Sequence, residues 1–213
     1  MIRLHGYWRS GAAYRVRIAL ALKGLAYEQV NHDLRTGAQG SPAFAALNPQ
    51  KLVPALEFEE QVLTQSSAII EWLDERFPDA PLLPADPAAR AQVRALVATI
   101  ASDTHPLHNL RVGKYLRTTL GADEDAVTTW NRHWIAEGLA AVEAMVARHG
   151  GGFAYGDTPT MADCFTVPAL YSANRFGVDM SAFPKLIAAG EAAAALPAFQ
   201  AAHPSVQPDA DAV

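Results

Sequence analysis

Short apolar segments alternate with segments of helical spacing over the first 80 residues of the chain. Strands are expected at 1–7, at 26–34 and as a pair within 52–65, where an acidic turn separates the two. Helices are expected at 14–23 and 66–77, with a glycine and a proline directly after them. Strands interleaved with helices predict an α/β layer that contains at least one parallel pair.

The pattern becomes helical after a proline-rich stretch. Residues 81–87, PLLPADP, cannot donate a full set of backbone hydrogen bonds and are predicted to be a linker. Apolar residues then recur at helical spacing through 126–149, and the glycines at 150–152 end that helix. We therefore predict an α/β domain at 1–80 and an all-helical domain at 88–213, with a frayed tail from residue 203.

One helix start in the second half has a complete signature. In TPTMADCF, Thr160 is placed to bond the first-turn amides and Asp163 to reach back, which is the pattern of a capping box. Cys164 follows among apolar residues and is expected to be a buried thiol.

Composition and charge exclude several classes of protein. The chain has 213 residues, of which 50% are hydrophobic and 18% charged, and its formal net charge is −5. It has no basic run for nucleic acid, no signal-peptide pattern at the start and no apolar stretch that could span a bilayer. The single cysteine excludes an internal disulfide and suits a reducing compartment. We expect a soluble, cytoplasmic protein without nucleic-acid or membrane partners.

Three positions in the first half allow either a structural or a ligand-binding interpretation. Pro54 is either an edge-strand proline or part of a cis bond with Val53, which would turn the Val53 backbone toward an extended peptide. Ser66 either caps a helix or helps Gln65 to bind a carboxylate at the positive helix end. Ser10 either caps the first helix or donates a hydrogen bond to a bound thiolate.

The second half of the chain contains further candidate residues, which also allow either a structural or a ligand-binding interpretation. His105 and His108 lie three residues apart but lack a clear third ligand, so no metal is expected. Pro106 should kink its helix, and such kinks often mark the wall of a cleft. Asn109 and Arg111 either face this cleft or lie on a solvated surface. Arg175 lies close to a helix end, where a cation also interacts favourably with the dipole.

Taken together, these segments resemble the zeta class of glutathione transferases, and within it the bacterial maleylacetoacetate isomerases. The segments that carry the resemblance are YWRSGAAYRVRIALALKG, ALNPQKLVPAL, LTQSSAIIEWLDERFP, HPLHNLRV and MADCFTVPALYSANRFGVD. The resemblance runs over nearly the whole chain. It implies a thioredoxin-like N-terminal domain, a helical glutathione-transferase C-terminal domain, a homodimer and glutathione as cofactor.

The resemblance also implies roles for individual residues. Ser10 would activate the glutathione thiol, with Arg9 beside it as a second catalytic residue. Arg9 and Arg175 would bind the carboxylates of a dicarboxylic keto-acid substrate. The remaining glutathione-binding positions would be Gln39, Val53, Gln65, Ser66, His105, Asn109 and Arg111.

The implied reaction converts maleylacetoacetate to fumarylacetoacetate, a step in tyrosine and phenylalanine breakdown, by reversible addition of a thiolate to the cis double bond. The chain departs from the usual Ser-Ser-Cys of the class, because Gly11 and Ala12 follow Ser10. Leu110 stands where the related maleylpyruvate isomerases are expected to carry an arginine, which favours maleylacetoacetate. The alternatives are maleylpyruvate isomerase, a general transferase or dehalogenase, and a non-catalytic binding module.

Overall fold

A computed structural model describes residues 1–211 of the chain. The chain packs into two compact units, which are described separately below. The first unit comprises residues 1–82 together with the chain from Ala195 onward, and the second comprises residues 83–194. No helix among the described residues has both the length and the apolar character needed to cross a membrane.

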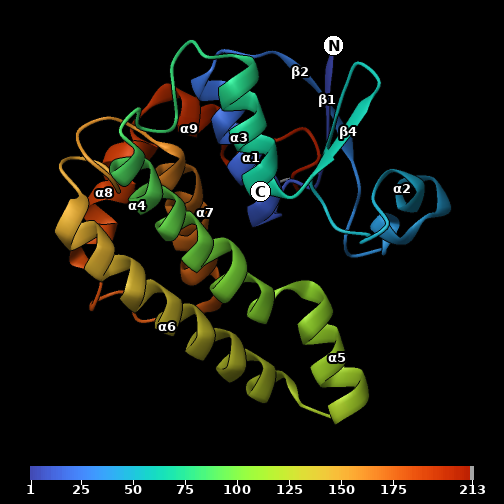
Figure 1. The fold of residues 1–213 in the computed structure, drawn as a ribbon. Coiled ribbons are helices and arrows are strands. Elements are labelled where there is room, and N and C mark those ends of the chain that lie inside the picture. The colour runs from blue at the N-terminus through green and yellow to red at the C-terminus, as the bar shows by residue number, and fades with distance from the viewer. Residues whose placement is uncertain (212–213) are drawn as a thin grey trace. The chain divides into compact units, whose positions relative to one another are not determined.

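The first unit contains a four-stranded mixed sheet in the order β2-β1-β3-β4 (Figure 1). Its strands are β1 (Ile2–Gly6), β2 (Tyr27–Asn31), β3 (Ala55–Phe58) and β4 (Gln61–Thr64). The β1–β2 pair is parallel, whereas the β1–β3 and β3–β4 pairs are antiparallel. The predicted α/β layer with one parallel pair is confirmed.

Helices cover both faces of this sheet. They are α1 (Gly11–Leu22), α2 (Pro42–Leu47) and α3 (Ser66–Arg76), with a short 3₁₀ helix η1 (Ala38–Gly40) before α2. α1 and α3 pack against each other, above the buried face that includes Leu4 and Leu56. On the opposite face, Phe44 of α2 lies in a cluster with Tyr7, Val53 and Ala55. Alternation along the strands therefore separates two apolar layers.

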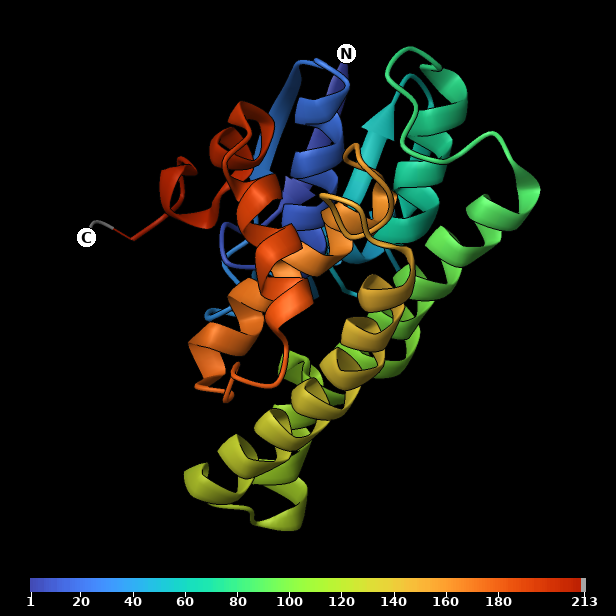
Figure 2. The same ribbon diagram turned by 90° about the vertical axis from the view of Figure 1, so that its left-hand side faces the viewer.

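The C-terminal segment belongs to this first unit and not to the second. Helix α9 (Pro197–Ala202) packs along α1, and a 3₁₀ turn, η4 (Pro204–Val206), follows it (Figure 2). The side chains of Phe199 and Ala202 are buried. The expected domain 88–213 includes this segment and stays a prediction. The expected fraying from residue 203 is wrong for the described part of the tail, because the Asp209 carboxylate accepts hydrogen bonds from Trp8 and Gln29.

The second unit consists of helices. They are α4 (Pro87–Ala98), the π-helix η2 (Thr99–Thr104), the 3₁₀ helix η3 (His105–His108), α5 (Leu110–Leu120), α6 (Glu124–His149), α7 (Met161–Phe176) and α8 (Pro184–Ala194). η2 continues α4 and packs against the long helix α6 (Figure 1). A Cβ atom on Gly138 of α6 would collide with the side chain of Thr104, so this close approach requires glycine.

Three predicted features of the second unit are confirmed. The helix that approaches Pro106 changes from α to π and then to 3₁₀ geometry, which is the expected break. Helix α7 begins with a full capping box, in which Thr160 and Asp163 each bond the backbone of the other. Cys164, in the same helix, is buried as expected.

Candidate functional site

The turn between β1 and α1 presents Arg9 and Ser10. Ser10 is the N-cap residue of α1, and its Oγ accepts a hydrogen bond from the Ala13 amide at 3.2 Å. A hydroxyl that accepts one hydrogen bond keeps its proton to donate elsewhere. The capping and the thiol-activating interpretations of Ser10 are therefore compatible.

The guanidinium of Arg9 lies over the aromatic ring of Trp8. Its guanidinium carbon lies 5.3 Å from the centre of the Trp8 ring, and the side chain is half-buried. The pKa of Asp33 lies below its ordinary value, chiefly because Arg35 donates hydrogen bonds to it, with a smaller contribution from the charge of Arg9. This cation can receive an anionic ligand beside Ser10.

Helix α3 begins without a side-chain cap. Gln65 at the N-cap position makes no capping hydrogen bond, and its φ of 68° is in the region that disfavours residues other than glycine. Its amide nitrogen instead donates to Gln50 Oε1 at 2.7 Å. The first amides of α3 and the positive end of its dipole thus stay open to an anion.

A buried arginine that the sequence analysis missed strengthens this positive end. Arg15 of α1 is 4% exposed, and its Nη1 donates to Ser66 Oγ at 3.3 Å. Burial lowers the pKa of the Arg15 guanidinium to about 9, so the group stays charged at neutral pH. The available signal was a pair of cations, Arg15 and Arg17, in an otherwise apolar helix.

Two further predicted residues of the first unit lie in the segments that precede β3 and α2. The Val53–Pro54 peptide is cis and immediately precedes β3. Gln39 lies in η1, and its Oε1 is buried without a hydrogen-bond partner among the described residues. A buried amide oxygen of this kind fits an N–H donor from a ligand.

The second unit holds the other four predicted residues. Asn109 is the N-cap of α5, where its Oδ1 accepts from the Val112 amide at 3.1 Å. Arg111 is exposed in the first turn of α5, and the ring of His105 lies 5.3 Å from that of His108. The guanidinium of Arg175 lies 4.6 Å from the ring centre of Phe176, at the end of α7. No group of three or more metal-binding side chains occurs among residues 1–211.

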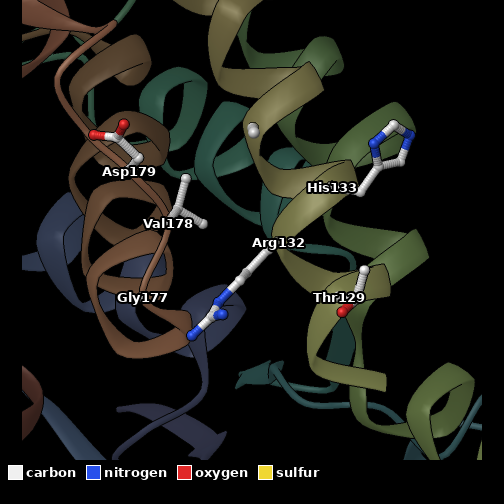
Figure 3. A pocket seen from close by; sticks show the side chains of 7 residues that line it. Thr129, Arg132, His133, Gly177, Val178 and Asp179 are labelled. Atoms are coloured by element: carbon white, nitrogen blue, oxygen red, sulfur yellow. The ribbon is translucent and has the colours of Figure 1, made fainter. Parts of the chain in front are cut away.

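A surface pocket of the second unit contains none of the predicted residues (Figure 3). It is lined by Thr129, Arg132, His133, Ala136, Gly177, Val178 and Asp179. Arg132 Nε donates to Phe176 O at 2.7 Å, which satisfies a carbonyl at the end of α7. We therefore attribute this pocket to the packing of α6 against the end of α7 and not to ligand binding.

Comparison with known proteins supplies the decisive observation. Models of the N-terminal and C-terminal domains of glutathione S-transferase match residues 4–81 and 128–207. A maleylpyruvate isomerase from a Ralstonia species is 49% identical over 98% of this chain and 99% of that protein. A maleylacetoacetate isomerase from Pseudomonas aeruginosa is 48% identical over 99% of this chain and 100% of that protein. The chain belongs to the zeta class of glutathione transferases.

Solved structures agree with this membership. A bacterial maleyl pyruvate isomerase of the zeta class superposes with a TM-score of 0.96 at 48% identity, over 98% of this chain and 100% of that one. A maleylacetoacetate isomerase from Anaeromyxobacter dehalogenans with bound GSH gives a TM-score of 0.91 at 48% identity, over 99% and 98% of the two chains. The predicted thioredoxin-like and helical fold classes are confirmed for this zeta-class transferase. The individual site residues stay predictions.

Proposed function

We propose that this protein is a glutathione-dependent cis–trans isomerase that converts maleylacetoacetate to fumarylacetoacetate. The observation that carries the proposal is the β1–α1 turn, which presents a cation and a hydroxyl with a proton to donate on adjacent residues, Arg9 and Ser10. A relative named maleylacetoacetate isomerase, 48% identical over 99% of this chain and 100% of its own length, supports it.

The first unit fits glutathione, a peptide with carboxylates at both ends. We assign the γ-glutamyl carboxylate to the open start of α3, at Gln65 and Ser66, where Arg15 adds a buried positive charge. Val53 would pair with the cysteinyl backbone. The buried Oε1 of Gln39 would accept an N–H of the peptide. These assignments combine the resemblance with the polar atoms that the structure leaves open.

Bound glutathione would supply a thiolate that adds to the cis double bond, which becomes a single bond and can rotate; elimination of the thiolate then restores the double bond in the trans form and regenerates the cofactor. Ser10 donates a hydrogen bond to the sulfur, which favours the ionised form and lowers the thiol pKa from its ordinary value near ~8.5. Arg9 binds a substrate carboxylate and stabilises the negative charge that develops on the conjugated carbonyl. Ser10 thus acts on the glutathione thiol, and Arg9 acts on the substrate to which the thiolate adds.

The assignments in the second unit come from the resemblance. We propose that Arg175 binds a substrate carboxylate and that His105, Asn109 and Arg111 contribute to glutathione binding. The capping hydrogen bond of Asn109 already explains that residue structurally. A homodimer, a cytoplasmic location and a role in tyrosine and phenylalanine breakdown are likewise proposed. Light scattering of the purified protein tests the dimer.

Maleylpyruvate is the second candidate substrate, since a relative 49% identical carries the name maleylpyruvate isomerase. The deciding experiment measures isomerisation of both substrates spectrophotometrically, with and without glutathione. We expect glutathione-dependent turnover with a higher kcat/KM for maleylacetoacetate. Preference for maleylpyruvate would overturn the substrate assignment. Glutathione binding without turnover of either would indicate a transferase, a dehalogenase or a binding module.

Three variants test the residue roles in the same assay. Ser10→Ala should lower kcat/KM roughly 100-fold or more, because the thiol loses its hydrogen-bond donor. Arg9→Lys should lose part of the activity and Arg9→Ala more, because lysine keeps the charge but not the bidentate geometry. An Arg9→Ala enzyme with unchanged kcat/KM would show that Arg9 has no role in the reaction.

A further inference from the structure

The turn that presents Arg9 and Ser10 is held partly by residues outside it. Its internal hydrogen bond runs from the Ser10 amide to Tyr7 O at 3.0 Å. The intervening Trp8 directs its own N–H and C=O toward other parts of the first unit. The position of the turn therefore depends on what binds the Trp8 backbone.

The tail of the chain provides the first of these partners. Asp209 Oδ2 accepts the Trp8 amide at 2.9 Å, across 201 residues of sequence. Asp209 Oδ1 accepts from Gln29 Nε2 of β2, also at 2.9 Å. Both carboxylate oxygens are used, and one side chain connects the tail, the turn and the sheet. A carboxylate acceptor makes a stronger hydrogen bond than a neutral one.

Arg17 provides the second link. Its side chain is almost fully buried, at 1% exposure. Nη2 donates to Trp8 O at 2.9 Å, and Nε donates to Ala202 O, at the end of α9, at 3.0 Å. The tail therefore binds the N–H of Trp8 directly, through Asp209. The C=O of Trp8 is bound by Arg17, which also donates to the end of the C-terminal helix α9.

The tail is itself fixed against the first unit. Gln207 is buried, and its Nε2 donates to Ala201 O at 3.0 Å and to His203 O at 2.9 Å. α9 packs along α1 (Figure 2). Asp209 is thus attached to a well-packed turn rather than to a loose end.

We propose that the C-terminal tail positions the catalytic turn, and that Asp209 is the positioning residue that acts through the Trp8 backbone. Fixing Trp8 fixes the ring over which the Arg9 guanidinium lies, and also the backbone that leads to Ser10. This inference rests on the proposed isomerase function of that turn. Small displacements of catalytic groups are costly, so loss of the tail contact should reduce turnover more than ligand binding.

The test compares Asp209→Ala and Asp209→Asn with the wild-type full-length protein. We measure kcat and KM for maleylacetoacetate, the Kd of glutathione, and the pKa of the bound glutathione thiol from its ultraviolet thiolate absorbance. Asp209→Ala should lower kcat roughly 10- to 100-fold and raise the thiol pKa, with KM and Kd changed less than about threefold. Asp209→Asn keeps one acceptor oxygen and should show a smaller shift in the same direction.

Asp211→Ala is the matched control from the same tail. Its carboxylate contacts Arg35 at 2.8 Å on the surface, and both side chains are about half exposed. The control should change kcat less than about twofold. If Asp209→Ala lowers only the thermal midpoint, with kcat and thiol pKa as in the wild type, the tail is merely structural and the proposal is wrong.

Two other outcomes also have a defined meaning. If Asp209→Ala does not fold, Asp209→Asn decides, and an Asn variant with wild-type kcat and thiol pKa overturns the proposal. If the wild type binds glutathione but does not isomerise maleylacetoacetate, the proposed function fails while the thiol pKa still tests the tail. A higher thiol pKa in the Asp209 variants would then support positioning independently of the substrate.

Discussion

Helices α3 and α7 begin with similar polar sequences, TQSS and TPTMAD, but their first turns are satisfied in different ways. At α7, Thr160 and Asp163 cap the backbone, and the Asp163 carboxylate is fully buried. At α3, the N-cap Gln65 makes no capping bond, has an unfavourable φ, and lies next to Ser66, which contacts the buried Arg15. A helix start that is complete within the chain stabilises the fold, whereas one left open is available to a ligand.

The largest effect is expected from Asp163→Ala. The carboxylate accepts hydrogen bonds from the Ala154 amide at 2.8 Å, the Thr160 amide at 2.8 Å and the Thr160 hydroxyl at 3.2 Å. Its removal leaves these buried donors without an acceptor, so the free energy of unfolding should fall by about 3–5 kcal/mol. Chemical denaturation measures the loss, and Glu191→Ala, an exposed carboxylate of the same unit, is the control. A fall in the free energy of unfolding of less than about 1 kcal/mol would mean that the cap of α7 does not stabilise the fold, and the contrast with the open start of α3 would be wrong.

The second prediction concerns the pH dependence of the same cap. Burial raises the pKa of Asp163 to about 6, against the opposing effect of its hydrogen bonds. Because the folded state then holds its proton more tightly than the unfolded state, the contribution of this group to stability is greatest below about pH 4. It should decline by up to about 3 kcal/mol as the pH rises to about 6.5.

Asp163→Asn removes this titration. The difference in unfolding free energy between wild type and Asp163→Asn should therefore change with pH in that range and be constant above it. A difference that stays constant from pH 4 to 7 would mean that the hydrogen bonds offset the burial of the carboxylate.

The third prediction addresses the open helix start. Gln65→Gly relieves the unfavourable backbone at φ 68° but loses the side chain proposed to bind glutathione. We expect the unfolding free energy to rise by up to about 1 kcal/mol and the Kd of glutathione to rise roughly 10-fold. Calorimetric binding and denaturation measure the two effects. Gln50→Ala, which removes the partner of the Gln65 amide, separates orientation of the side chain from its presence.

The smallest effect is expected at an exposed cap. Asp123 Oδ1 accepts the Ala126 amide at 2.8 Å at the start of α6, in a solvated position. Water can replace this carboxylate, so Asp123→Ala should cost only about 1 kcal/mol. If denaturation gives the same loss as Asp163→Ala, burial is not what distinguishes the two caps.

Much of the fold could be predicted because its signals are local. Strand alternation and helical spacing are properties of neighbouring residues, and the partners of the α7 capping box lie within a few positions of one another. Helix α1 begins at Gly11, earlier than the predicted residue 14, because Ser10 sets the helix start before the apolar periodicity does. The fraying predicted for the tail was wrong because its sequence, rich in proline and aspartate, contains no sign of a contact with Trp8.

By itself the sequence determined the order of the elements, the two fold classes and the resemblance to a glutathione-transferase class, since these depend on residue type and spacing. Only the tertiary structure decided which polar groups meet, Arg15 against Ser66 and Asp209 against the Trp8 amide, and that the buried Gln39 oxygen has no partner among residues 1–211. Such pairs join residues that are distant in the chain. Their energies depend on burial and on hydrogen-bond geometry, and both exist only once the chain has packed.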